Sequence, residues 1–90
     1  MKFLASPGRF YQNDAAGNMV AEVTFTIKDD VVSINHTFVD PSLRGQGVAG
    51  KLMVAVADYA RKHHYWIKPV CSYSQMFFQK FTEYQDLVKE

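Results

Sequence analysis

The stretch Asp40-Pro41-Ser42-Leu43-Arg44-Gly45-Gln46-Gly47-Val48-Ala49-Gly50-Lys51 joins two different patterns of the chain. A β-rich run ends at Asp40, and a helical pattern begins near Gly47. Glycines at the mouth of a helix let backbone N–H groups approach an anion closely, and the helix dipole adds partial positive charge there. This stretch therefore predicts a phosphate-binding loop, whose ligand depends on the surrounding chain.

Composition predicts one globular domain that spans residues 1–90, with 48% hydrophobic and 21% charged residues. The formal net charge is +1, and no basic run is long enough to follow a polyanion, so nucleic acid is not an expected partner. No apolar run reaches the ~18–20 residues that a membrane helix needs. The single cysteine, Cys71, and the lack of a signal-peptide pattern predict a cytoplasmic protein. The expected oligomeric state is a monomer or weak homodimer.

Before the loop, the pattern predicts three antiparallel strands. Arg9 to Asn13 is a short strand, and Asp14 to Asn18 supplies the residues of a reversing turn. Ala21 to Ile27 and Val31 to Val39 alternate between apolar and polar residues, with a turn at Lys28 to Asp30 between them. In the third strand, period-two alternation predicts one shared face for Val32, Ile34, His36 and Phe38.

After the loop, a helix is predicted through about His64. Its apolar stripe is formed by Val48, Leu52, Val56, Tyr59 and Ala60. Tyr65 to Val70 reads as a strand parallel to Val31 to Val39, because a helix joins the two. A second helix follows over Ser74 to Phe81, and Tyr84 to Val88 adds a final turn.

Phe77, Phe78 and Phe81 are the predicted anchors of this second helix. The predicted fold is therefore α+β, with an antiparallel meander, a β-α-β crossover and a C-terminal helix on one mixed sheet.

Two familiar phosphate-binding motifs match the glycines but not their context. The dinucleotide fingerprint G-x-G-x-x-G should follow its strand directly, whereas Pro41 to Arg44 intervene, and Lys68 to Val70 lie where its acidic residue should be. The nucleotide motif G-x-x-x-x-G-K requires Ser or Thr next, and Leu52 stands there instead. Neither nucleotide class is therefore favoured.

A third motif fits both the spelling and the context. Arg44-x-x-Gly47-x-Ala49 resembles the pyrophosphate signature [Q/R]-x-x-G-x-[G/A] of the GNAT acetyltransferase superfamily. The flanking residues His36-Thr37-Phe38-Val39, Arg44-Gly45-Gln46-Gly47 and Pro69-Val70-Cys71 resemble the short, stand-alone GNAT-like branch of the YjdJ type. The resemblance extends over roughly Arg9 to Leu87, nearly the whole chain.

The resemblance implies a GNAT-like fold that binds acetyl-coenzyme A between two strands that part. It assigns coenzyme binding to Phe38, Val39, Arg44, Gly45, Gln46, Gly47, Val48, Ala49 and Gly50. The implied reaction moves an acetyl group from acetyl-coenzyme A to an amine of a small molecule or a protein, by direct attack or through Cys71. The strand-helix-helix segment that usually shapes the acceptor pocket is mostly missing, so an alternative is a non-catalytic coenzyme A or acyl-coenzyme A binding module.

Acetyl transfer needs a neutral amine and a proton for the departing thiolate, and His36, Cys71 and Tyr73 are the catalytic candidates. His36 is either a general base or a hydrogen-bonded core residue. Cys71 precedes a predicted helix, which favours a thiolate, although free cysteines are often simply buried. Tyr73 is either a proton donor or an aromatic packing residue. No spacing of cysteines and histidines indicates a metal site.

Overall fold

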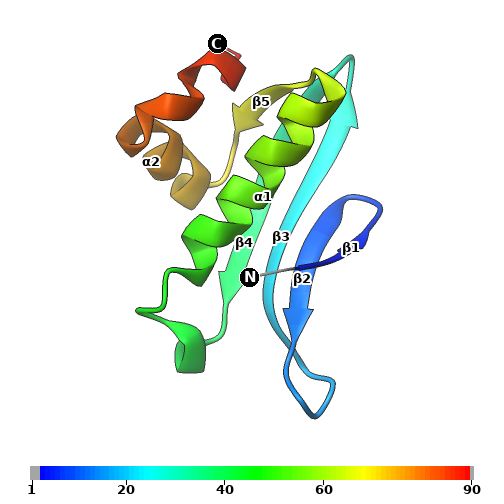
Figure 1. Ribbon diagram of the computed structural model, residues 1–90, viewed down its shortest axis with the longest axis vertical. Coiled ribbons are helices and arrows are strands. Elements are labelled where there is room, and N and C mark those ends of the chain that lie inside the picture. The colour runs from blue at the N-terminus through cyan, green and yellow to red at the C-terminus, as the bar shows by residue number, and fades with distance from the viewer. Residues whose placement is uncertain (1–2, 90) are drawn as a thin grey trace.

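The computed structural model describes residues 3–89 and contains one five-stranded sheet with two helices. The strands are β1 (Leu4–Ser6), β2 (Arg9–Asn13), β3 (Met19–Lys28), β4 (Val31–Val39) and β5 (Trp66–Pro69). The helices are α1 (Val48–His63) and α2 (Ser72–Lys80), with 3₁₀ turns η1 (Pro41–Leu43) and η2 (Thr82–Leu87). In Figure 1, α1 runs along one face of the sheet, and α2 lies beyond β5.

The sheet has the strand order β1-β2-β3-β4-β5, with β4 and β5 parallel and all other pairs antiparallel. The predicted α+β fold with one mixed sheet is confirmed. The short strand β1 was not predicted, although Pro7-Gly8 before β2 is a turn signal. Gly8 has a φ of +78°, and a Cβ there would lie 3.0 Å from the carbonyl oxygen of Phe25. The Gly8 carbonyl accepts a hydrogen bond from the Phe25 N–H, so glycine fits this close approach.

Helix α1 covers the sheet with the predicted apolar stripe. Val48, Leu52, Val56 and Ala60 are buried, and Met53 and Ala57 widen the stripe. They pack against buried residues of β3, β4 and β5, namely Ala21, Val23, Phe25, Val32, Ile34 and Ile67. Full burial of an aliphatic side chain stabilises the fold by about 1.5–3 kcal/mol, so this layer contributes most of the hydrophobic stabilisation.

A β-bulge in β4 reverses which side chains face α1. Ile34 lies opposite Phe25, but His36 lies opposite Thr24, so Asn35 is the extra residue. Downstream of the bulge, Thr37 faces α1, and His36 turns to the opposite face, where it is exposed. An inserted residue inverts every later position of a strand.

The prediction that Val32, Ile34, His36 and Phe38 share one face is therefore wrong for the last two. Phe38 lies with His36 on the face of the sheet away from α1 and is 36% exposed. Thr37 and Val39, opposite Val23 and Ala21, occupy the face toward the helix instead.

The C-terminal residues pack against α1 and β5. Phe77 and Phe78 are buried as predicted, but Phe81 is not a core anchor. It follows the last turn of α2, remains 39% exposed, and packs its ring against Phe77 at a centroid distance of 4.6 Å. Arg61 of α1 pairs with Asp86 of η2 at 2.8 Å, and the N–H of Lys89 donates to the Ile67 carbonyl.

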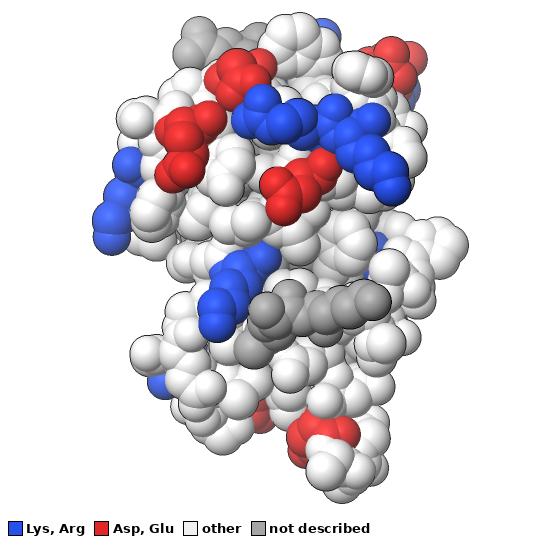
Figure 2. All heavy atoms as spheres, viewed as in Figure 1, with Lys and Arg blue, Asp and Glu red and all other residues white. Residues whose placement is uncertain are grey.

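The surface in Figure 2 carries interspersed positive and negative side chains on the α1 side of the molecule, with no broad patch of one sign. No helix within residues 3–89 is both long enough and apolar enough to cross a membrane.

Candidate functional site

The candidate site begins where β4 and β5 stop pairing. Their register runs from Val31 opposite Trp66 to Ile34 opposite Pro69. The N–H groups of Val70 and Cys71 then both donate to the Ile34 carbonyl at 3.0 Å. Beyond this point β4 continues to Val39, whereas the segment after β5 turns away and forms α2. The two strands thus part, which leaves an open edge on β4.

The register identifies the backbone groups on that open edge. The Asp40 N–H donates to the Val20 carbonyl at 2.8 Å. In an antiparallel pair every second residue bonds to the same neighbour, so Asp40 and every second residue before it direct their backbone groups to β3. The backbone groups of Phe38, two positions earlier, therefore also point to β3. Thr37 and Val39 alternate with these residues, so their N–H and C=O groups point the other way, into the gap left where β5 parts from β4. Of the two residues expected to hold the pantetheine arm, only Val39 has this direction.

The loop after β4 leads into α1, and no side chain caps the N-terminus of that helix. The Asp40 carboxylate accepts a hydrogen bond from the Ser42 N–H at 2.9 Å, and this bond lowers the pKa of Asp40 below its usual value. Gly45 and Gly47 have φ values of +85° and +73°, a region that favours glycine. Because α1 has neither a side-chain cap nor an acidic residue in its first turn, its first amide groups have no such partner.

A small cavity of about 180 Å³ lies over these amides. Its lining consists of Val39, Leu43, Arg44, Gly45, Gly47, Val48, Ala49, Gly50 and Tyr73. Seven of the nine predicted coenzyme residues are in this set, and Phe38 and Gln46 are not. The short segment thus gathers around one hollow at the start of α1.

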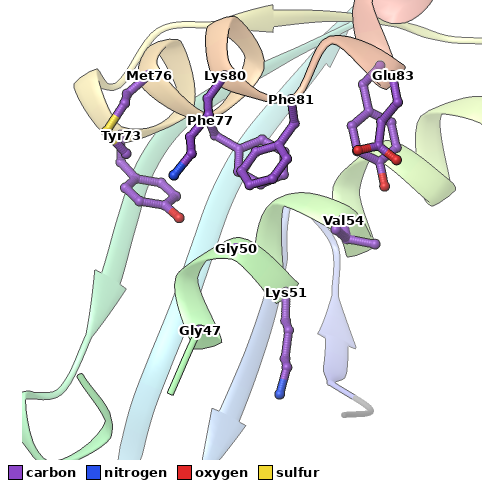
Figure 3. A pocket seen from close by; sticks show the side chains of 11 residues that line it. Gly47, Gly50, Lys51, Val54, Tyr73, Met76, Phe77, Lys80, Phe81 and Glu83 are labelled. Carbon is purple, nitrogen blue, oxygen red and sulfur yellow. The ribbon is translucent and has the colours of Figure 1, made fainter. Parts of the chain in front are cut away.

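A larger cavity of about 540 Å³ continues between α1 and α2 (Figure 3). Gly47 and Gly50 line it from α1, and Tyr73 and Phe77 line it from α2. A Cβ on Gly50 would lie 3.7 Å from the Tyr73 hydroxyl, so the missing side chain leaves room between the helices. The remaining lining includes two cations and one acid: Lys51, Lys80 and Glu83. The two cavities share Gly47, Gly50 and Tyr73.

The sulfur of Cys71 lies between two hydroxyl groups at the first turn of α2. Its Sγ is 3.2 Å from Ser74 Oγ and 3.5 Å from Thr37 Oγ1. Burial of the thiol raises the pKa of Cys71, but hydrogen bonds from Thr37 and from the first amides of α2 lower it overall. A lower pKa increases the fraction of thiolate at a given pH, as expected for a cysteine at a helix start.

The two hydroxyls have different roles toward this sulfur. Fully buried Ser74 donates its one proton to the Cys71 carbonyl oxygen at 2.8 Å, so it accepts from the S–H group. Thr37 is therefore the one of the two whose proton can be directed at a thiolate. Sequence reasoning missed Ser74. It also missed Thr37, because the bulge that turns Thr37 toward Cys71 has no clear sequence signal.

The other two catalytic candidates occupy separate places. Tyr73 lines both cavities, and its burial raises its pKa, so the hydroxyl keeps its proton at neutral pH. His36 lines neither cavity and is exposed on the far face of the sheet. It is thus not a core residue. Within residues 3–89, no three His, Cys, Asp or Glu side chains gather as a metal site would require.

Comparisons with known proteins agree with this architecture. The family model described as GCN5-related N-acetyl-transferase matches residues 9–87. The chain is 32% identical to a GCN5-like candidate N-acetyltransferase from Staphylococcus aureus, whose solution structure matches with a TM-score of 0.82. That match covers 98% of this chain and 87% of the other. The chain therefore belongs to the GCN5-related N-acetyltransferase family.

Larger relatives share the fold at lower identity. A GNAT N-acetyltransferase from Escherichia coli, solved in complex with coenzyme A, is 24% identical, with a TM-score of 0.56 over 63% of this chain and 35% of the other. The ribosomal-protein-S18-alanine N-acetyltransferase from the same organism is 18% identical, with a TM-score of 0.62 over 80% and 49%. This chain thus matches less than half the length of either. No curated protein matches its sequence.

Proposed function

We propose that this protein binds acetyl-coenzyme A and transfers the acetyl group to an amine. The observation that carries the proposal is the order of three features: the cavity at the glycine loop, the unpaired edge of β4, and the sulfur of Cys71 next to Thr37 of that edge. A molecule with an anionic end, an extended amide-bearing arm and a reactive thioester matches these three parts in order. Membership of the family and a relative's complex with coenzyme A support this choice.

The coenzyme would be held mainly by backbone groups. The unpartnered amides of the first turn of α1 suit the pyrophosphate, because they combine N–H donors with the positive end of the helix dipole. The N–H and C=O groups of Thr37 and Val39 suit the amides of the pantetheine arm, as a strand would. The wider cavity, with Lys51 and Lys80, then has the size and charge for the nucleotide end.

Transfer can proceed by two routes. In direct attack, the amine nitrogen forms the bond to the acetyl carbon, the carbon–sulfur bond of the thioester breaks, and the coenzyme leaves as a thiolate. The amine proton passes to His36 or to water, and Tyr73 can protonate the thiolate. In the covalent route, the Cys71 thiolate first takes the acetyl group and releases the coenzyme thiolate. The amine nitrogen then attacks the acetyl carbon, the carbon–sulfur bond to Cys71 breaks and restores its thiolate, and the amine proton passes to His36 or to water.

The proposed binding is tested by titrating the ¹⁵N-labelled protein with acetyl-coenzyme A and following amide chemical shifts. We expect changes at Gly45 to Gly50 and at Thr37 and Val39, with little change at Gly17 in the distant hairpin turn. Unchanged shifts in the glycine loop would overturn the proposal. Release of free thiol in the presence of a panel of amines then tests turnover.

The two routes differ in their effect on Cys71. Mass spectrometry after exposure to acetyl-coenzyme A detects an acetyl adduct on Cys71 if the covalent route operates. Without an adduct, and with full transfer by Cys71→Ala, direct attack remains. In that case a changed pH–rate profile in His36→Gln supports His36 as the proton acceptor.

The alternative of a binding module without turnover has one structural observation in its favour. No element among the described residues covers the part of the sheet around His36 and Phe38, and neither residue lines the two cavities described above, so no walled acceptor pocket surrounds them. Shifts in the glycine loop together with no thiol release from any amine in the panel would favour this alternative.

A further inference from the structure

A third cavity, of about 430 Å³, lies near the β3–β4 turn and is not part of the coenzyme site. Its lining is formed by Lys28, Asp29, Val31, Ser33, Lys68 and Lys89. The lysines come from three separate segments, namely the end of β3, strand β5 and the residues after η2. The sequence pattern places none of them together, and the sheet does so.

Among the described residues that line this cavity, positive charge is in excess. Three lysines face one carboxylate, that of Asp29. The ion pairs formed within residues 3–89 are Arg9–Glu22 and Arg61–Asp86, and neither includes a residue of this cavity. Like charges that converge without a counterion repel one another, and a bound anion removes that repulsion. The excess charge therefore indicates an anionic ligand.

The cavity opens on the same face of the sheet as His36. Ser33 lies opposite Lys68 in the β4–β5 register, with its side chain on the face away from α1. His36 is on that face as well, because of the bulge. Ser33 and His36 are three positions apart along β4, which corresponds to about 10 Å at ~3.3 Å per residue. The last β4–β5 pair, where the strands part, is the next one after Ser33 and Lys68.

We propose that Lys28, Lys68 and Lys89 form a binding site for an anionic group, and that this group belongs to the amine acceptor. The second half of this statement rests on the proposed acetyl transfer. With coenzyme A on the α1 side, the uncovered face is where an amine can reach the gap between β4 and β5. An acceptor whose phosphate or carboxylate lies about 10 Å from its amine would span both places. The substrate class is thus an amine that also carries a negative charge.

The matched probes for this site are aminohexyl phosphate and aminohexanol, which share the amine and the chain but differ in the phosphate. In an amide-shift titration, aminohexyl phosphate should move the signals of Val31, Ser33 and Lys68, and aminohexanol should not. The affinity should fall as salt is added, because exposed charges are screened. Equal shifts with both probes, or none with either, would overturn the anion site.

Two single variants separate this site from general surface charge. Lys68→Gln should weaken binding of aminohexyl phosphate about two- to fivefold, the usual worth of one exposed charge contact. Lys62→Gln removes an exposed lysine of α1 outside the cavity and should leave the affinity unchanged. The same loss in both variants would count against the site.

Acetyl transfer is the separate readout for the acceptor role. Aminohexyl phosphate should be acetylated with a lower KM than aminohexanol. Lys68→Gln should raise the KM for aminohexyl phosphate about two- to fivefold, whereas Lys62→Gln should leave the KM values for both amines unchanged. Equal KM values would overturn the acceptor role. Shifts at the cavity with no transfer to either amine would support the anion site and overturn the proposed transfer.

Discussion

The two halves of β4 differ in what they do, although they belong to one strand. From Val31 to Ile34 the strand pairs with β3 on one side and β5 on the other. From His36 to Val39 it keeps only β3. The paired half contributes fully buried side chains, and the open half contributes backbone groups and the Thr37 hydroxyl. The candidate site thus arises where the pairing of β4 with β5 ends, and Asn35 marks the boundary between the two halves.

The largest expected effect is on stability in the paired half. Ile34→Ala should lower the free energy of unfolding by about 2–5 kcal/mol, because Ile34 is fully buried in the hydrophobic core. Val39→Ala, in the open half and only partly buried, should cost less than about 2 kcal/mol. Urea unfolding followed by circular dichroism measures both. An equal cost would show that the open half packs as tightly as the paired one.

A pair of glycine substitutions with a smaller expected effect on stability separates backbone strain from coenzyme binding in the loop that follows the open half of β4. Gly47→Ala places a side chain at a φ of +73° and should cost about 1–2 kcal/mol. Gly17→Ala, at a φ of +88° in the β2–β3 turn, should cost about the same. Neither added Cβ meets another atom within 4 Å. Only Gly47→Ala should weaken acetyl-coenzyme A binding, as measured by calorimetry; equal weakening would assign the loss to stability alone.

The smallest expected change is chemical. Thr37→Val keeps the shape of the side chain but removes the proton that can reach the Cys71 thiolate, so the pKa of Cys71 should rise. A higher pKa means less thiolate at a given pH, and the alkylation profile with iodoacetamide should move to higher pH. At neutral pH the rate should fall about two- to tenfold, the worth of one hydrogen bond. Thr37→Ser, which keeps the hydroxyl, should react like the parent; a similar fall in Thr37→Ser would assign the effect to packing.

Much of the fold follows from local pattern. The apolar stripe of α1, the alternation of β3 and the turn residues before it are all visible in the sequence, because each depends on residues a few positions apart. The exposure of Phe81 and the strand β1 were not predicted. Both depend on what a neighbouring segment covers or pairs with, which periodicity does not contain.

The candidate site divides in the same way. Gly45 and Gly47 could be found from sequence, because only the local backbone requires glycine there. The face of His36 could not, because one extra residue in β4 decides it, and Asn35 looks like any other polar strand residue. Thr37 was missed for the related reason that it acts through Cys71, which is 34 residues away in the sequence.

By itself, the sequence determined the glycine loop, the helix that follows it and the succession of strands β2 to β5, because these arise from short-range sterics and amphipathic periodicity. Only the tertiary structure decided which half of β4 lies open, which hydroxyl meets the Cys71 sulfur and where three lysines converge. Those features depend on strand register and on contacts between distant segments, and a shift of one residue inverts them.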